Sequence, residues 1–296
     1  MEMNERADPI LQHKANKPSK IQSTVTANHH KGYQPMNIRK RKRKKGADLA
    51  AALLIPLIII AVWQYAAGEG YISSLFLPTP LSIAQEFSHL IVTGELFHHL
   101  GISMYRAFIG FLAGSFLGLA LGTLTGFSRI ASYLVDPSIQ VLRLVPHLAI
   151  APLIILWFGF GEISKVVIIT SGAFFPLYIH TYTGIRNVDN KLYEVGEVLE
   201  FSLKQKLMRL ILPAALPSIL LGIRLSLAVS WIGLVVAELI GSKSGVGFLI
   251  NQAKQNSDTE VIFVGIIIFA AVGKLIDSMM RILEKKLLHY RDSYLG

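Results

Sequence analysis

The sequence predicts an all-α integral membrane protein with six transmembrane helices, and the composition gives the first reason. Of the 296 residues, 52% are hydrophobic and only 16% are charged, whereas soluble domains contain about 25% charged residues. The second reason is the length of the apolar segments, since about 20 apolar residues in a helix cross the roughly 30 Å core of a bilayer. The sequence contains no cysteine, which excludes disulfides, zinc ribbons and thiol catalysis.

The positive charge is concentrated near the amino terminus. The formal net charge is +10, and residues 1–46 hold twelve basic and three acidic residues. We interpret residues 1–46 as a disordered cytoplasmic tail. Its basic run, residues 39–45, directly precedes the first apolar segment, which is typical of a topology determinant that contacts anionic lipid. A nuclear-localisation or nucleic-acid patch is the alternative, but the nearly neutral remainder of the chain argues against a nucleic-acid-binding core.

Six apolar segments are predicted to cross the membrane. They cover residues 48–68, 101–127, 138–160, 164–185, 211–240 and 261–283. The first follows some 46 residues, which is too long for the basic region of a cleaved signal peptide, so an uncleaved anchor is predicted. A short amphipathic helix on the outer surface is expected at residues 79–99. The transmembrane domain then covers residues 47–290, and residues 291–296 form a short tail.

The loops between the spans differ in positive charge, and basic residues are retained on the cytoplasmic side of a membrane. Six spans put both termini on the same side. If that side is the cytoplasm, the outer loops contain only Lys165, Lys243 and Lys254. The inner loops and the tail then contain Arg129, Arg186, Lys191, Lys204, Lys206, Arg209, Lys285, Lys286 and Arg291. The sequence therefore predicts that both termini are cytoplasmic.

The second span has a glycine at every fourth position, which places all five on one helix face. These residues are Gly110, Gly114, Gly118, Gly122 and Gly126. Glycines at this spacing let a neighbouring backbone approach closely, because lipid provides no hydrophobic drive for helix association. We interpret the face as a helix-packing surface rather than a ligand contact.

Prolines interrupt two of the spans. Pro137 directly precedes the third span, which contains Pro146 and Pro152, and the fifth begins with Pro213 and Pro217. An interior proline frees a backbone carbonyl, which is tolerated where protein or a water-filled cavity satisfies it. Kinked helices are therefore expected in both spans.

Ionisable residues inside the spans are candidates for a translocation pathway, because a charge in mid-membrane costs about 2.5–3.5 kcal/mol on insertion scales. In the fifth span, Arg224, Trp231 and Glu238 recur at helical spacing on one face. Together with Arg143 they form the candidate pathway. The alternative is that Arg224 pairs with carbonyls or an acid of a neighbouring helix and that Glu238 lies at an interface.

The other ionisable residues in the spans are assigned structural roles. Arg106 and Arg143, which lie nearer the helix ends, are predicted to snorkel towards the interface. Lys274 and Asp277, three residues apart, are placed to pair along the sixth helix. The histidines inside the spans are isolated in sequence, so no metal site is predicted.

The longest inner connection, residues 186–210, alternates apolar and charged residues at helical spacing. Two short helices on the membrane surface would present such apolar stripes. A structured amphipathic element at the cytoplasmic face indicates a docking surface for a soluble partner.

This connection resembles the EAA loop of ABC importer permeases, whose pattern is E-A-A, three residues, G, nine residues and I-x-L-P. Glu194-Val195-Gly196 matches its start and Leu210-Ile211-Leu212-Pro213 its end, at the family spacing. The sequence departs from the pattern in two places: Val195-Gly196 replaces the two alanines, and Glu200 stands where the family has a glycine. The glycine makes the turn between the two short helices in the family, so Glu200 puts that turn in question.

The resemblance extends over about residues 50–290 and is greatest to the nitrate, sulfonate and taurine subgroup. The matching stretches are LPTP (77–80), WFGFGEISK (157–165), GAFFPLYIHTYTGIRNVD (172–189), LPAALPSILLGIRLSLAVSWIGLVVAELIG (212–241) and SGVGFLI (244–250). It implies a five-helix permease core plus an amino-terminal helix in a bacterial plasma or inner membrane. It also implies a homodimer that assembles with two ATP-binding subunits and an extracytoplasmic solute-binding protein.

The same resemblance assigns a coupling role to part of the inner loop, which would sit in a cleft of the ATPase. The implied coupling residues are Glu194, Val195, Gly196, Leu199, Glu200, Phe201, Leu212 and Pro213. In this assignment Glu194 caps the first short helix, and Leu199 and Phe201 are apolar anchors. A sulfonate, taurine or nitrate is the expected solute, and a thiamine-precursor pyrimidine or another small organic solute is the alternative.

The sequence has no G-x-x-x-x-G-K-[ST] phosphate loop, so ATP and magnesium are expected on the partner ATPase and the chain itself is expected to be neither an enzyme nor a cofactor carrier. Two other functional classes are alternatives. A membrane-embedded lipid enzyme requires clustered carboxylates, histidines or a nucleophile, which the sequence lacks. An ion-driven secondary transporter favours paired intramembrane acids and inverted repeats, which it also lacks.

Overall fold

The computed structural model describes residues 45–146 and 148–289. The chain divides into two units, Met1–Ile55 and Pro56–Gly296, and the description concerns the second unit together with the helix that leads into it. The predicted tail 1–46, apart from its last two residues, and the predicted tail 291–296 lie outside the described residues.

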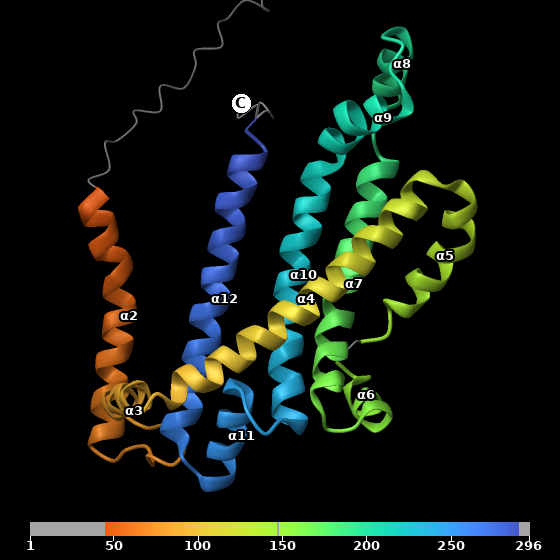
Figure 1. The fold of residues 1–296 in the computed structure, drawn as a ribbon. Helices are drawn as coiled ribbons and strands as arrows, with labels where there is room; N and C mark the ends of the chain where they lie inside the picture. Colours follow the sequence, from red (N-terminus) through yellow and green to blue (C-terminus); the bar gives the residue numbers. More distant parts are fainter. Residues whose placement is uncertain (1–44, 147, 290–296) are drawn as a thin grey trace, which may run out of the picture. The chain divides into compact units, whose positions relative to one another are not determined.

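Every regular element in the described part of the chain is a helix (Figure 1). The elements are α2 (Lys45–Gly68), α3 (Pro80–Val92), α4 (Glu95–Phe127), α5 (Arg129–Leu142), α6 (Ala151–Phe158), α7 (Glu162–Arg186), α8 (Asn190–Val198), α9 (Leu203–Lys206), the π-helix η1 (Leu207–Ile211), α10 (Leu212–Gly241), α11 (Val246–Asn256) and α12 (Thr259–Leu287).

Within the described residues, four helical segments are long and apolar enough to cross a membrane. They are α4, α7, the continuous segment Leu203–Gly241 that contains α10, and α12. The part of α2 whose side chains are described, Leu54–Gly68, is a shorter apolar helix. These five segments coincide with five of the six predicted spans, which confirms the all-α membrane fold.

The third predicted span, residues 138–160, is wrong as a continuous helix. α5 ends at Leu142 and α6 begins at Ala151. Pro146 lies in the gap; a proline lacks an N–H donor and disfavours helical backbone in the residue before it. Pro152 occupies the first turn of α6, where a missing N–H costs nothing.

The predicted amphipathic helix at residues 79–99 is also divided. The hydroxyl of Thr79 accepts a hydrogen bond from the Ser82 N–H at 3.0 Å, which caps the start of α3. α3 ends at Val92, and Gly94 turns the chain with a φ of 76°. Residues 95–99 therefore belong to α4, which begins six residues before the predicted second span.

α4 and α7 run side by side in the same direction. A Cβ on Gly110 would lie 2.6 Å from the Cβ of Ile169, and one on Gly126 would lie 3.0 Å from that of Ile185. Because the two helices are parallel, the chain between them, residues 128–161, must return across the same thickness. α5, the break and α6 make this return, so the third crossing exists as a broken segment.

The glycine face predicted for packing lies against α7. All five glycines of this face are buried. A Cβ on Gly118 would lie 2.7 Å from the Phe174 carbonyl oxygen, and one on Gly122 would lie 2.8 Å from the Tyr178 carbonyl oxygen. Only a hydrogen atom fits at these positions, so the two backbones approach as closely as the glycine spacing predicts.

α7 is the most enclosed of the long helices and packs against α10 as well. α10 runs antiparallel to α7, since Gly172 faces Val229 and Gly184 faces Ser218. The Ser218 hydroxyl donates to the His180 carbonyl at 2.7 Å. Interhelical hydrogen bonds of this kind are worth about 0.6 kcal/mol each in a membrane. These contacts fix the register of α10 against α7, and the other face of α10 is directed at α12.

Candidate functional site

The connection between α7 and α10 forms two short helices beyond the ends of both long helices (Figure 1). A carboxylate oxygen of Asp189 accepts a hydrogen bond from the Lys191 N–H at 3.0 Å and caps the start of α8. The assignment of this cap to Glu194 is therefore wrong, because Glu194 lies inside α8 with its side chain exposed. Its carboxylate is too far along the helix to meet the free N–H groups of the first turn.

The turn between α8 and α9 keeps the geometry of a glycine turn although Glu200 occupies it. Glu200 has a φ of 52°. Its N–H donates to the Glu197 carbonyl, and the Phe201 N–H donates to the Gly196 carbonyl, both at 2.9 Å. These two bonds form a Schellman motif, in which glycine usually takes the left-handed position. The substitution at position 200 thus retains the turn at a cost in backbone strain of about 1–2 kcal/mol.

One face of this loop packs back onto the start of α10. Leu192, Tyr193 and Leu207 contact a buried cluster that includes Ile211. Gly196 is buried, and a Cβ there would lie 2.9 Å from a methyl carbon of Leu210. Gly196, which replaces an alanine of the family pattern, therefore lets α8 pack closely against η1.

The opposite face of the loop exposes apolar side chains. We call it the loop patch: Val195 is 45%, Val198 83%, Leu199 55% and Leu203 87% exposed. Phe201 is only half-buried, and the Arg209 guanidinium lies 5.6 Å from its ring centre. Of the two predicted anchors, Leu199 belongs to the loop patch and Phe201 is covered in part by Arg209.

The last two predicted coupling residues open α10. Leu212 is 41% exposed. Pro213 lies in the first turn of α10, directly after the π-helix η1, inside the continuous helical segment Leu203–Gly241. Both residues lie where the loop runs into the long helix.

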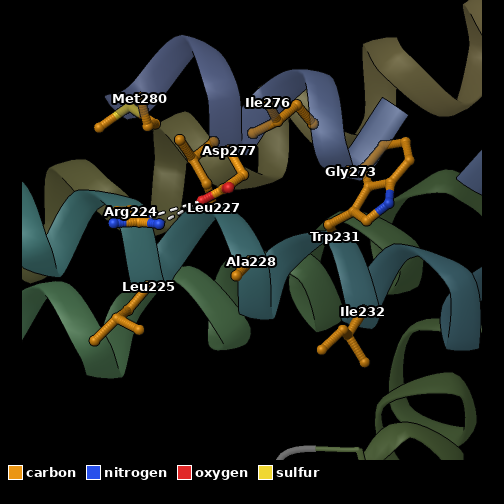
Figure 2. A pocket seen from close by; sticks show the side chains of 10 residues that line it. All are labelled: Arg224, Leu225, Leu227, Ala228, Trp231, Ile232, Gly273, Ile276, Asp277 and Met280. Carbon is orange, nitrogen blue, oxygen red and sulfur yellow. Dashed lines mark hydrogen bonds and ion pairs between the residues drawn. The ribbon is translucent and has the colours of Figure 1, made fainter. Parts of the chain in front are cut away.

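Two of the four candidate pathway residues meet in a cavity between α10 and α12 (Figure 2). Arg224 Nη2 lies 2.7 Å and Nε 3.0 Å from Oδ1 of Asp277, across the two helices. The Asp277 Oδ2 lies 2.9 Å from Nη2 of Arg281. Asp277 therefore pairs with Arg224 and Arg281, in place of the predicted pairing with Lys274. The pairing of Arg224 with an acid of a neighbouring helix agrees with the alternative interpretation of this residue.

Trp231 closes the same cavity on one side. Its indole Nε1 donates to the Phe269 carbonyl at 3.1 Å. A Cβ on Gly273 would lie 3.2 Å from that nitrogen, so glycine lets the ring approach the backbone of α12 closely. The cavity has a volume of about 310 Å³.

The other two candidate pathway residues lie elsewhere. Arg143 is exposed at the end of α5, beside the break in the third crossing. Glu238 is fully buried and forms an ion pair with Arg106 at 2.8 Å. Arg106 is itself only 1% exposed, so its predicted snorkelling is wrong. The sequence contains no local sign of this pair, because 132 residues separate its members.

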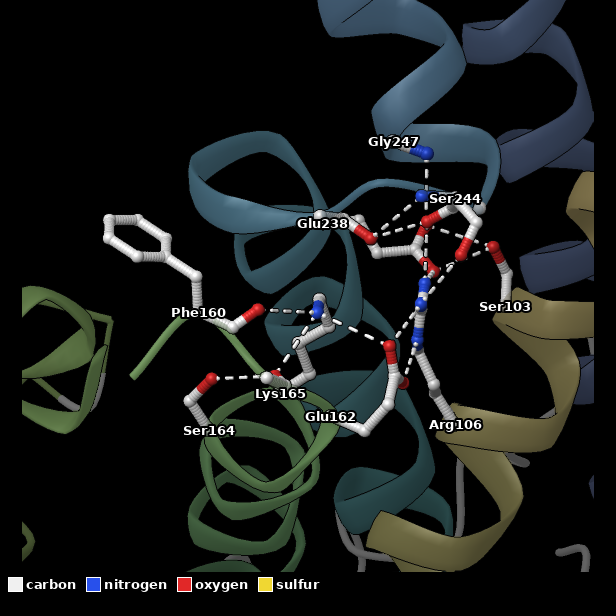
Figure 3. Close-up of polar contacts among 12 residues, drawn as sticks. Ser103, Arg106, Phe160, Glu162, Ser164, Lys165, Glu238, Ser244 and Gly247 are labelled. Carbon is white, nitrogen blue, oxygen red and sulfur yellow. Dashed lines mark hydrogen bonds and ion pairs between the residues drawn. The ribbon is translucent and has the colours of Figure 1, made fainter. Parts of the chain in front are cut away.

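A polar network surrounds this pair near the ends of four helices (Figure 3). The Ser103 hydroxyl and the Gly247 N–H both donate to Glu238, at 2.8 and 2.9 Å. Arg106 also donates to the carboxylate of Glu162 at 2.6 and 2.7 Å. α4, α7, α10 and the start of α11 are therefore joined by charged hydrogen bonds, which are stronger than neutral ones.

Comparison with known proteins places this architecture in a family. The family model "Binding-protein-dependent transport system inner membrane component" matches residues 110–289. The chain is 57% identical over 259 residues to the putative aliphatic sulfonates transport permease protein SsuC of Bacillus subtilis, which covers 88% of this chain and 94% of that protein. It is 43% identical to the protein of the same name in Escherichia coli, over 85% of this chain and 95% of that protein.

A third relative is the taurine transport system permease protein TauC of Escherichia coli, which is 33% identical over 78% of this chain and 86% of that protein. Two solved structures share the fold. The inward-facing MetNI methionine ABC transporter gives a TM-score of 0.54 at 16% identity, over 62% of this chain and 92% of that chain. An amino acid ABC transporter with histidines gives 0.57 at 17% identity, over 67% and 97%. The chain belongs to the inner membrane components of binding-protein-dependent transport systems, as the resemblance in its sequence predicted.

Proposed function

We propose that the chain is the membrane-spanning permease of an ATP-driven importer of small sulfonates, either an aliphatic sulfonate or taurine. The observation that carries the proposal is the 57% identity to an aliphatic sulfonate permease over 88% of the chain. A binding protein outside the membrane delivers the solute, and two ATP-binding subunits hold ATP and magnesium. Two copies of the chain enclose the pathway.

The proposed orientation places both termini and the α8–α9 loop in the cytoplasm. The loop contains Lys191, Lys204 and Lys206, and the last turn of α12 contains Lys285 and Lys286. α10 and α12 are antiparallel, since Arg224 pairs with Asp277 and Trp231 contacts Phe269 further along. The loop before α10 and the end of α12 therefore share one side, which supports the inside assignment by its positive charge.

The loop patch is the proposed contact with the ATP-binding subunit. Exposed large apolar side chains on a water-facing helix pair indicate a protein partner. Closure of the two ATP-binding subunits on ATP would pull the loops together and rock the two permease chains between outward-open and inward-open states. The packing of Leu207 and Tyr193 onto the cluster at Ile211 transmits that movement to α10.

The transport proposal is tested with proteoliposomes that contain the chain and its ATP-binding subunits, supplied with the binding protein and radiolabelled taurine or 1-butanesulfonate. Uptake is expected to require ATP and to persist when an ionophore dissipates ion gradients. Uptake that collapses with the ionophore while ATP is maintained would identify an ion-driven transporter. Movement of nitrate or a thiamine-precursor pyrimidine without movement of sulfonates would overturn the proposed solute.

The docking proposal is tested by a matched pair of variants. Val198→Asp places a charge in the loop patch, and Val92→Asp makes the same change at the end of α3; both valines are 83% exposed. Only Val198→Asp is expected to release the ATP-binding subunit in a pull-down from detergent. Equal retention of the subunit by both variants contradicts the docking role.

A further inference from the structure

We propose that the cavity between α10 and α12 is a sulfonate-binding subsite inside the membrane, in which Arg224 holds the sulfonate group and Asp277 competes for the same guanidinium. This inference rests on the proposed function and adds to it the place and the chemistry of solute contact.

The first support is the depth of the charges. Arg224 lies near the middle of the 30-residue α10, and Asp277 lies in the inner half of the 29-residue α12. Their side chains are 34% and 36% exposed. An exposed charge at this depth is costly against lipid, so intramembrane ion pairs face a water-filled cavity or a protein interior. The pair therefore supplies the charged end of a cavity whose other walls are apolar.

The second support is that the ion pair between Arg224 and Asp277 can separate without leaving either charge unpaired. Both hydrogen bonds from Arg224 go to the same oxygen of Asp277, at 2.7 and 3.0 Å. The other oxygen of Asp277 stays with Arg281 at 2.9 Å. When a ligand anion takes the guanidinium of Arg224, Asp277 keeps a cation. The main cost of breaking an ion pair, which is the charge left without a partner, is thereby avoided.

The third support is the match between the guanidinium and a sulfonate. A sulfonate spreads one negative charge over three oxygens, and the planar fork of arginine donates two parallel hydrogen bonds to such a group. The Arg224 Nη1 lies 3.6 Å from Oε2 of Glu284, so its remaining donor faces a second carboxylate. Two acids around one arginine keep the anion site weak enough to release its solute.

The fourth support is the apolar remainder of the cavity. Beyond the ion pair its walls include Leu227, Trp231, Ile276 and Met280 (Figure 2). Ala228, one turn after Arg224, leaves the space between the charge and the indole open. A volume of about 310 Å³ is at the lower end of small-molecule sites. A short alkyl chain fits these walls while its sulfonate contacts Arg224.

The test measures binding of 1-butanesulfonate to the assembled transporter in nanodiscs without the binding protein, by isothermal titration. 1-Butanesulfonamide, which has the same shape without the charge, is the ligand control. Arg224→Gln is expected to weaken butanesulfonate binding about tenfold or more, as for loss of a charge-assisted hydrogen bond. Asp277→Asn is expected to tighten it, because a competing carboxylate is removed.

Two further variants keep the test decisive. Ala228→Leu fills the cavity with the ion pair in place and is expected to abolish butanesulfonate binding even if Arg224→Gln fails to assemble. Lys254→Gln removes an exposed cation from α11, away from the cavity lining, and is expected to leave the affinity within about twofold. Equal binding of sulfonate and sulfonamide, or unchanged affinity in Ala228→Leu, overturns the subsite.

The outcome is separable from that of the transport assay. If the unaltered protein shows no ATP-dependent uptake of sulfonates, the proposed function is wrong. Uptake by Arg224→Gln with an unchanged KM for butanesulfonate would contradict the subsite alone and leave the function standing.

Discussion

Arg106 of α4 and Glu238 of α10 form an ion pair of 2.8 Å in which the two side chains are 1% and 0% exposed. The hydroxyl of Ser103 and the N–H of Gly247 add hydrogen bonds to the same carboxylate. Glu238 is thus held from α4 and from the start of α11. Together with the Gly247 bond, the pair connects the end of α10 to the short helix that follows it.

Removing one member of this pair is expected to destabilise the protein strongly. Glu238→Ala takes from Arg106 its fully buried carboxylate partner and leaves the Ser103 hydroxyl and the Gly247 N–H without their acceptor. The loss of each such buried hydrogen bond costs about 1–3 kcal/mol. The apparent Tm of the purified protein in detergent, followed by size-exclusion chromatography after heating, should fall. Glu69→Ala, at an exposed carboxylate, serves as the control and should not move it. A double variant, Arg106→Met with Glu238→Met, is expected to be more stable than Glu238→Ala; a lower Tm for the double variant contradicts the ion-pair account.

The close contact of α4 and α7 makes a second stability prediction. A Cβ on Gly114 would overlap the Thr170 carbonyl oxygen and lie 2.6 Å from the Cβ of Ala173. Gly114→Ala must therefore push the two backbones apart, at a cost of about 1–3 kcal/mol.

The matched control lies on the same helix. Gly101 has no atom within 4 Å of where its Cβ would be, so Gly101→Ala is expected to be neutral or to gain up to about 1 kcal/mol in helix propensity. Thermal unfolding of both variants under one condition decides the matter. Equal Tm values would show that the glycine face does not set the α4–α7 distance.

The Glu200 turn predicts a gain rather than a loss. Glu200→Gly removes the cost of a side chain at a φ of 52° and is expected to stabilise the turn by up to about 1 kcal/mol. Hydrogen exchange at the amides of Glu200 and Phe201 should slow. Glu197→Gly, at an exposed position inside α8, is the control and is expected to speed the same exchange, because glycine weakens a helix interior.

How far the sequence predicts the structure depends on the range of the interaction that decides each feature. The glycine face and the inner loop were predictable because helical spacing and the family pattern are local. The break after Leu142 was predictable only in part. The prolines indicate a kink, but tertiary contacts decide whether the helix continues directly after it. The Arg106–Glu238 pair was not predictable, because nothing in the spacing along one helix shows which charge on another helix faces it. For the same reason the sequence alone allows two interpretations of Arg224, since it does not show that Asp277 of α12 lies beside it.

The orientation of the chain gives the last prediction, and the absence of cysteine from its sequence makes the measurement clean. Lys204→Cys and Lys254→Cys make the same change at exposed positions in α9 and α11, which lie at opposite ends of α10. If the inner loop is cytoplasmic, a membrane-impermeant maleimide labels Lys254→Cys in intact spheroplasts and labels Lys204→Cys only after permeabilisation. The cysteine-free parent supplies the background. Labelling of Lys204→Cys in intact spheroplasts would invert the topology, and with it the side on which the loop patch meets its ATP-binding partner.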